Sequence, residues 1–168
     1  MIGTTHVAME KVSKAILRYL FQEYLKGPSV QYSINEITNR FKSDPVAVSN
    51  FMMDRHWIRE QWIHQTNLVT CRITVLGIEE VAPAFVHNKI KYLITGLIKA
   101  GGRKSLTEIF ENKIEEYAVA FDIVCQLENL GLVTIMHDEG SLDITLTAEG
   151  WQYLEKQGKS LYALMAMA

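Results

Sequence analysis

The feature that most constrains the fold is an internal repeat at an offset of 73 residues. CRITVLGIEEV (residues 71–81) and DITLTAEGWQYL (residues 143–154) share a threonine followed three residues later by glycine, at Thr74 and Gly77 and again at Thr147 and Gly150. At the same offset, ILRYLFQEYLKG (residues 16–27) aligns with KIKYLITGLIKA (residues 89–100). A third pair, SINE (33–36) and SLTE (105–108), follows at an offset of 72. Matches in order at a nearly constant offset favour two copies of one unit over chance similarity between amphipathic helices.

Each copy predicts three helices, a two-stranded hairpin and a further helix. Residues 16–27 and 89–100 have apolar residues at the helical period and run into glycine, a helix stop signal. SINE and SLTE fit the capping box and open a second helix. The third helix of the first copy has Ser43 or Asp44 as its cap and Pro45 at its first position. That of the second copy has an apolar stripe of Val119, Ile123, Leu127 and Leu130.

The hairpins follow the third helices, with turns at residues 65–67 and 138–141 and a further helix from Gly77 and from Ala148 onward. A first turn at residues 66–67 sets Trp62 opposite Cys71 and Gln61 opposite Arg72. One face of this hairpin is then expected to be buried, namely Ile58, Trp62, Cys71, Ile73 and Val75. The other face carries Arg59, Gln61, Arg72 and Thr74.

This order of elements, with the [IL]-T-x-x-G step that leaves each hairpin, resembles the winged-helix family, a variant of the helix-turn-helix that includes bacterial and archaeal transcriptional regulators. The resemblance covers almost the whole chain, twice. It implies a mainly α fold with small β-hairpin wings (α+β) and two tandem winged-helix domains related by the internal repeat. The expected boundaries are residues 8–82 for the first domain, 84–156 for the second and 157–168 for an apolar C-terminal helix or tail.

The family resemblance implies binding to double-stranded DNA, with the third helix in the major groove and the wing against the backbone or minor groove. Residues 1–83 carry nine lysines and arginines against eight acidic residues, whereas residues 84–168 carry eight against eleven. Carboxylates in the second wing tip, HDEGSLD, and at Glu115 and Asp122 would repel phosphates. We therefore expect a transcriptional regulator that binds DNA through its first domain and uses its second domain for dimerisation or interaction.

The candidate DNA-binding residues lie before, on and after the third helix of the first domain and in its wing. They are Arg40, Lys42, Ser49, Asn50, Arg55, Arg59 and Arg72. Asn50 could read adenine through paired hydrogen bonds, and Ser49 could touch a phosphate or a base. Arg59 and Arg72 are plausible phosphate contacts. Ordinary solvated charge is the alternative explanation for the arginines.

The C-terminal segment GKSLYALMAMA has hardly a charge, so its apolar surface must be covered, either by the rest of the chain or by a second molecule. A homodimer interface formed by Leu161, Leu164 and Met165 is one explanation, and packing within the chain is the other. Two further functions stay open. Tandem winged helices also occur in protein-interaction scaffolds of the chromosome-segregation or assembly type, and a pocket near Trp57, Trp62 or Trp151 could receive a small molecule, although core packing of these tryptophans is favoured.

Other function classes find no support in the sequence. KAGGRKS lacks the spacing of a phosphate-binding loop, no histidine stands at metal-binding spacing from another histidine or a cysteine, and no nucleophile elbow is present. We therefore expect no enzyme, cofactor or metal. The chain has 48% hydrophobic residues and a formal net charge of −2, with no signal peptide or membrane-spanning run. Cys71 and Cys125 are expected to be reduced core thiols in a cytoplasmic protein.

Overall fold

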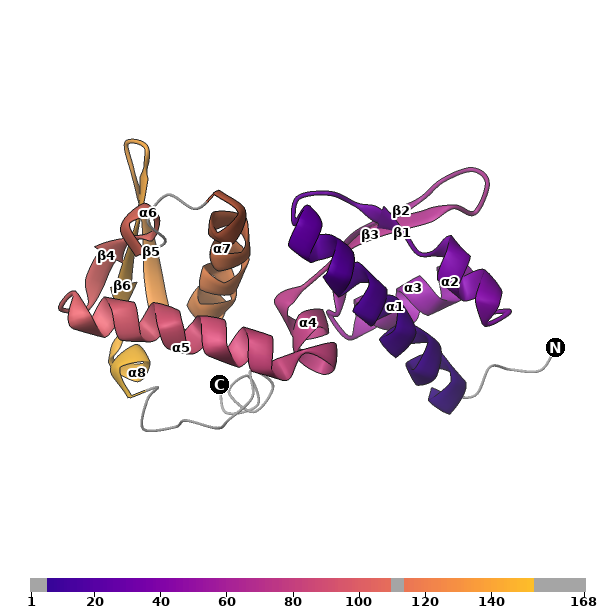
Figure 1. Ribbon diagram of the computed structural model, residues 1–168, viewed down its shortest axis with the longest axis horizontal. Coiled ribbons are helices and arrows are strands. Elements are labelled where there is room, and N and C mark those ends of the chain that lie inside the picture. Colours follow the sequence, from indigo (N-terminus) through magenta and orange to yellow (C-terminus); the bar gives the residue numbers. More distant parts are fainter. Residues whose placement is uncertain (1–5, 110–113, 153–168) are drawn as a thin grey trace. The chain divides into compact units, whose positions relative to one another are not determined.

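The structure is a computed structural model that describes residues 6–109 and 114–152. It divides into two compact units, Met1–Ala82 (unit 1) and Pro83–Ala168 (unit 2), and each is described by itself (Figure 1). Both units combine helices with a small antiparallel sheet of three strands. The chain is therefore a mixed α+β protein.

Unit 1 packs four helices on its sheet. Its elements are α1 (His6–Lys26), β1 (Tyr32–Ser33), α2 (Asn35–Arg40), α3 (Pro45–Asp54), β2 (Ile58–Ile63), β3 (Val69–Ile73) and α4 (Val75–Val81), and the strand order is β1-β3-β2. The core lies between α1, α3 and the inner face of the sheet, where Leu17, Ile34, Val48, Met52 and Cys71 are all fully buried.

Unit 2 repeats the same order of elements. These are α5 (Pro83–Lys99), β4 (Arg103–Ser105), α6 (Leu106–Ile109), α7 (Ile114–Asn129), β5 (Val133–Asp138), β6 (Ser141–Leu146) and α8 (Ala148–Trp151), with strand order β4-β6-β5. In α7 the expected stripe is buried at Val119, Ile123 and Leu127, and Leu130 is half-buried. Gly140, with φ of +82°, lies in the two-residue turn between β5 and β6, inside the predicted turn.

The third strand of each sheet was not predicted. β1 pairs with β3 through Tyr32 and Cys71, and β4 pairs with β6 through Lys104 and Ile144. These strands have only two and three residues, too few for a recognisable alternation, and they form because the centre strand offers them its free edge.

The expected capping box of α2 is wrong because the Ser33 hydroxyl bonds to the N–H of Asn35 rather than to that of Glu36. Ile34 is the N-cap of α2 and makes no side-chain capping bond, while the Ser33 hydroxyl accepts a hydrogen bond from the Asn35 N–H at 3.3 Å. In unit 2 the Ser105 hydroxyl does accept from the Glu108 N–H, also at 3.3 Å. For α3, the predicted cap is confirmed, since Asp44 accepts from the Val46 N–H at 3.1 Å and Pro45 occupies the first position.

The repeated Thr-x-x-Gly motif joins each hairpin to its last helix. Thr74 and Thr147 cap α4 and α8 by accepting from the N–H groups of Gly77 and Gly150, at 3.1 Å in both units. A Cβ at Gly77 would lie 2.2 Å from the Trp57 carbonyl oxygen, and one at Gly150 would lie 2.1 Å from the carbonyl oxygen of Leu132. Only glycine lets the helix approach the neighbouring backbone this closely.

The predicted register of the first hairpin is wrong along its whole length, by two residues up to Arg59 and by one residue after it. Arg59 pairs with Arg72, but the next paired residue is Trp62, opposite Thr70, so β2 has one residue more than β3 across this step. Glu60 adopts the left-handed conformation there, with φ of +52°. The extra residue is a β-bulge, which turns the following side chains to the opposite face. Trp62 is consequently 61% exposed instead of buried, whereas Ile58, Cys71, Ile73 and Val75 are buried as expected.

The two cysteines differ in burial, although both are free thiols. Cys71 lies on the inner face of the sheet with no exposed surface, and this burial raises the pKa of its thiol to about 12. Cys125 on α7 is half-buried. The expectation of a buried thiol is therefore confirmed for Cys71 and only partly for Cys125.

Candidate functional site

The exposed face of α3 presents Asn50 but not Ser49. Asn50 is exposed, while Ser49 has no accessible surface and its hydroxyl donates to the Val46 carbonyl at 3.0 Å. The sequence-based expectation that Ser49 faces solvent is wrong, because the helix buries Val48, Ser49 and Met52 and leaves Phe51 only half-buried. A small hydroxyl that bonds to its own helix fits such a position without an unpaired polar group.

Gln61, on the bulged strand β2, forms hydrogen bonds with two residues of α3. Its amide nitrogen donates to the Asn50 side-chain oxygen at 2.9 Å and to the Ser49 hydroxyl at 2.5 Å. These bonds fix the orientation of the Asn50 amide while its NH2 group and a second lone pair on its oxygen can still bond elsewhere. Sequence reasoning placed Gln61 on the solvent face of the hairpin but gave it no role, because the contact depends on the bulge.

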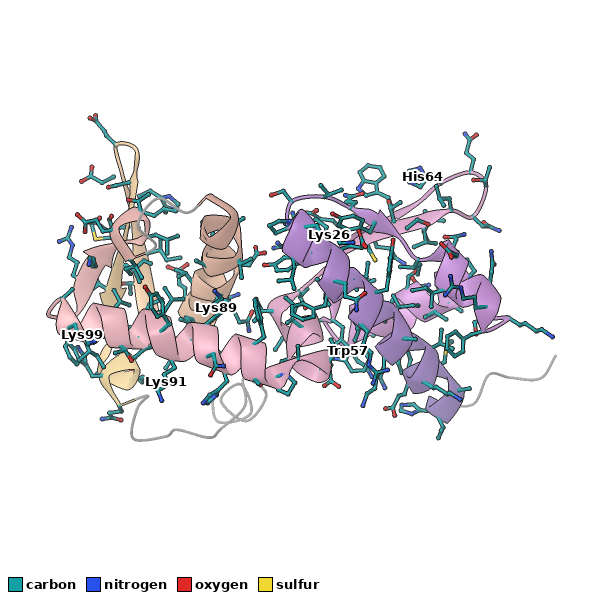
Figure 2. All side chains as sticks on the ribbon, in the orientation of Figure 1. Lys26, Trp57, His64, Lys89, Lys91 and Lys99 are labelled. Carbon is teal, nitrogen blue, oxygen red and sulfur yellow. The ribbon has the colours of Figure 1, made fainter. Side chains whose placement is uncertain are left out.

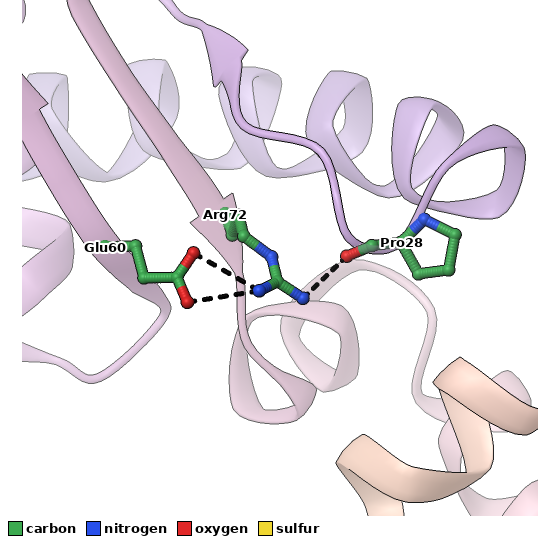
Figure 3. A network of polar contacts seen from close by, with 3 residues as sticks. All are labelled: Pro28, Glu60 and Arg72. Atoms are coloured by element: carbon green, nitrogen blue, oxygen red, sulfur yellow. Dashed lines mark hydrogen bonds and ion pairs between the residues drawn. The ribbon is translucent and has the colours of Figure 1, made fainter.

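Arg72 is held inside unit 1 (Figure 3). One terminal nitrogen donates to both carboxylate oxygens of Glu60, at 3.1 and 3.2 Å, and the other donates to the Pro28 carbonyl at 2.8 Å. Its side chain is only 16% exposed. The guanidinium thus links β3, β2 and the loop after α1, and the proposed phosphate contact would have to replace these bonds.

The other two arginines near the hairpin are also engaged. The Arg55 guanidinium lies 3.6 Å from the centre of the Phe51 ring and 5.5 Å from that of Trp57, and it is 2.7 Å from the His6 ring nitrogen. Arg59 on β2 is half-buried and faces Arg72 across the strand pair. Stacked arginine is stiff and weakly hydrated, so Arg55 serves the packing of α3 as well as carrying charge.

Arg40 and Lys42 lie around the turn from α2 to α3, and both are exposed. Arg40 forms an ion pair with Glu36 one helical turn earlier. Lys42 has φ of +52° and, within the part of the chain that the structure describes, no ion-pair partner. Of the seven candidate residues, Lys42 and Asn50 are therefore the two best placed for an outside contact.

The tip of the first hairpin carries no charged side chain, and exposed apolar side chains flank it. Trp62, Ile63 and Leu68 are 61%, 48% and 38% exposed, and residues 61–71 contain no lysine, arginine, aspartate or glutamate. Asn67, with φ of +55°, completes the turn, and the Asn35 amide nitrogen donates to its carbonyl at 2.9 Å. Residues 61–71 therefore offer a phosphate no lysine or arginine.

The β5–β6 hairpin of unit 2 is acidic at its tip, where Met136, Asp138 and Glu139 are exposed. Arg103 at its base pairs with Asp143 at 2.6 Å. The proposed dimer-interface residues Leu161, Leu164 and Met165 lie outside the described residues, and the side chain of Glu115 lies outside them too.

Comparison of the chain with protein-family models, curated proteins and solved structures finds no match. The function therefore has to be inferred from the chain itself. Among the described residues, no group of three or more histidine, cysteine, aspartate or glutamate side chains could hold a metal ion. None of the described helices is both long and apolar enough to cross a membrane.

Proposed function

We propose that this chain is a tandem winged-helix protein that binds double-stranded DNA through α3 of unit 1 and acts as a transcriptional regulator. The supporting architecture is the order helix, strand, two helices, two strands, helix, found in each unit with the sheet order first, third, second strand. The family places the third helix of this arrangement in the major groove.

The single observation that carries the proposal is the exposed Asn50 amide, held in place by Gln61 across 2.9 Å. A pre-oriented asparagine on an exposed helix face suits the paired hydrogen bonds that adenine offers in the major groove. Lys42, in the turn that precedes α3, supplies a phosphate contact. With so few free cations, binding depends on base contacts more than on charge.

The test is fluorescence anisotropy with pooled genomic fragments at low and moderate salt. Asn50→Ala should relax preference at one base position by about 1–3 kcal/mol, and Lys42→Ala should flatten the salt dependence by about one unit. Asp122→Ala in unit 2 is the control and should change neither. Absence of salt-dependent binding by the wild-type protein at low salt would refute DNA binding.

Arg72→Ala separates a phosphate contact from a structural role. We expect it to lower the free energy of unfolding of unit 1 by about 1–3 kcal/mol, because Glu60 and the Pro28 carbonyl lose their partner. The salt slope of DNA binding should stay unchanged. A slope reduced by about one unit in a stably folded variant would restore the original assignment of Arg72 to the phosphate backbone.

A second candidate function is a protein-interaction scaffold that forms a homodimer, and the uncharged wing tip is the observation that favours it. Trp62 and Ile63 expose large apolar surfaces side by side in the sequence, as interface residues do. Sedimentation velocity of the wild type and of Trp62→Ser decides whether the wing joins two copies. A dimer that becomes a monomer in the variant supports this candidate, whereas identical masses remove the wing from the interface.

A further inference from the structure

A groove of about 470 Å³ opens on the surface of unit 2 between α5 and α6. Its lining includes three lysines and a single acidic residue, Glu108, and so has a formal net charge of +2. This positive surface lies in the unit whose sequence is the more acidic of the two. It goes beyond the DNA-binding face proposed for unit 1.

The three lysines surround the groove from two elements. Lys91 and Lys99 both project from α5, eight residues apart and thus about 12 Å along the helix (Figure 2). Lys104 approaches from β4. No ion pair holds any of the three within the described residues. Their charges are therefore available to an outside anion.

Gly96 and Ile109 form an apolar floor of the groove, and no side chain fills the space at Gly96. Glycine inside a helix is unfavourable, yet a Cβ at Gly96 would meet only the Ile109 side chain, at an ordinary distance of 3.7 Å. The fold therefore does not require glycine here. Its effect is to leave an opening above the Ile109 side chain, which is 5% exposed, and beside Tyr92, which is 57% exposed and whose hydroxyl donates to the Ile109 carbonyl at 3.4 Å.

Unit 1 has a groove of about 380 Å³ between α1 and α2, the two helices that correspond through the repeat to α5 and α6. Its lining matches that of the unit 2 groove at six positions: Ala15 and Asn88, Arg18 and Lys91, Tyr19 and Tyr92, Gln22 and Thr95, Glu36 and Glu108, and Ile37 and Ile109. The groove is thus a property of the repeated unit, and differences between its two copies show what is particular to unit 2.

The two copies differ most where Gly96 replaces Glu23. In unit 1 the Glu23 carboxylate pairs with Lys26 at 2.8 Å. Burial and then the charges of Glu23 and Glu36 raise the pKa of Tyr19, so carboxylates lie close to that ring. At the corresponding place in unit 2, Lys99 follows Gly96 and the acid is missing. The replacement both opens the floor and leaves the lysine without its neutralising partner.

We propose that the unit 2 groove binds an acidic peptide segment of a partner protein, with an apolar side chain on the floor at Gly96 and Ile109 and carboxylates on Lys91, Lys99 and Lys104. The apolar floor distinguishes this ligand from a nucleic acid, whose backbone would bring only hydrated phosphates to it. Glu108 on the wall also opposes a dense row of phosphates.

The test uses the full chain and a fluorescein-labelled peptide in which glutamate–aspartate pairs alternate with single leucines. We expect anisotropy to report binding that weakens with salt. The double variant Lys91→Glu/Lys99→Glu should weaken it by about tenfold or more. Gly96→Leu, which fills the floor, should weaken the leucine-containing peptide by a similar factor, about tenfold, but leave an all-acidic peptide unaffected.

Arg18→Glu is the matched control, since Arg18 holds the place of Lys91 in the unit 1 groove. It should leave the affinity within about twofold of the wild type. Thermal unfolding of each variant checks that unit 2 stays folded. The proposal is overturned if the peptide does not bind, if Arg18→Glu weakens it as much as Lys91→Glu/Lys99→Glu, or if Gly96→Leu has no effect. Tighter binding of an oligothymidylate of equal charge would assign the groove to nucleic acid instead.

Discussion

Gly77 and Gly150 are the residues at which one added methyl group does most damage. Each would place a Cβ little more than 2 Å from a backbone oxygen that cannot move independently of its strand. We predict that Gly77→Ala and Gly150→Ala each lower the free energy of unfolding of their own unit by at least about 2 kcal/mol. Gly96→Ala is the control and should raise it by roughly 0.5–1 kcal/mol, because the helix gains and nothing clashes. Urea unfolding curves measure all three, and a neutral Gly77→Ala would contradict the close approach.

Cys71 should make the free energy of unfolding of unit 1 fall as the pH rises through the alkaline range. Its pKa is about 12 in the folded chain and near 9 when exposed, so the folded state resists ionisation. This stabilisation is fully present below about pH 9 and is lost as the pH rises toward 12, by about 1.4 kcal/mol per pH unit. Relative to Cys71→Ala, the wild type should therefore lose stability between about pH 9 and 10.5. A constant difference between the two over that range would show that Cys71 ionises as an exposed thiol does.

At the scale of the element, the bulge in β2 decides which side chains the first hairpin exposes to solvent. It turns Trp62 outward to 61% exposure, while Trp57, just before the strand, is 6% exposed. We predict that Trp62→Ala changes the free energy of unfolding by less than about 1 kcal/mol, whereas Trp57→Ala costs about 3–5 kcal/mol. Acrylamide should quench the fluorescence of Trp62 strongly and that of Trp57 weakly. Equal quenching would indicate the unbulged register.

In the helix α3, too, the tertiary structure decides which side chains are exposed. Its cap and its first residue follow from local chemistry at Asp44 and Pro45, and both were predictable. Which side of the helix is buried depends on the neighbouring elements. In the structure Ser49 is buried and Phe51 is half-buried. The helical period alone therefore predicts an exposed Ser49, although this residue has no surface with which to contact a ligand.

At the scale of the whole molecule, the chain consists of two units that each have their own sheet and core. Units of this size bury enough surface to fold alone. We predict that fragments 1–82 and 83–168, expressed separately, both give dispersed amide NMR spectra whose peaks match those of the full chain away from the cut. A collapsed spectrum for either fragment would show that its core needs the other unit.

The sequence by itself determined the repeat, the helices, the hairpins and the Thr-x-x-Gly joint, because these follow from period, capping and turn chemistry within short segments. Only the tertiary structure decided the third strands, the bulge, the burial of Ser49 and the pairing of Arg72 with Glu60. The physical reason is that one extra residue in a strand reverses every later side chain, and local propensity hardly registers that residue. Local propensity leaves several strand registers and helix faces nearly equal in energy. Contacts between residues distant in the sequence therefore decide which side chains of this chain face the solvent.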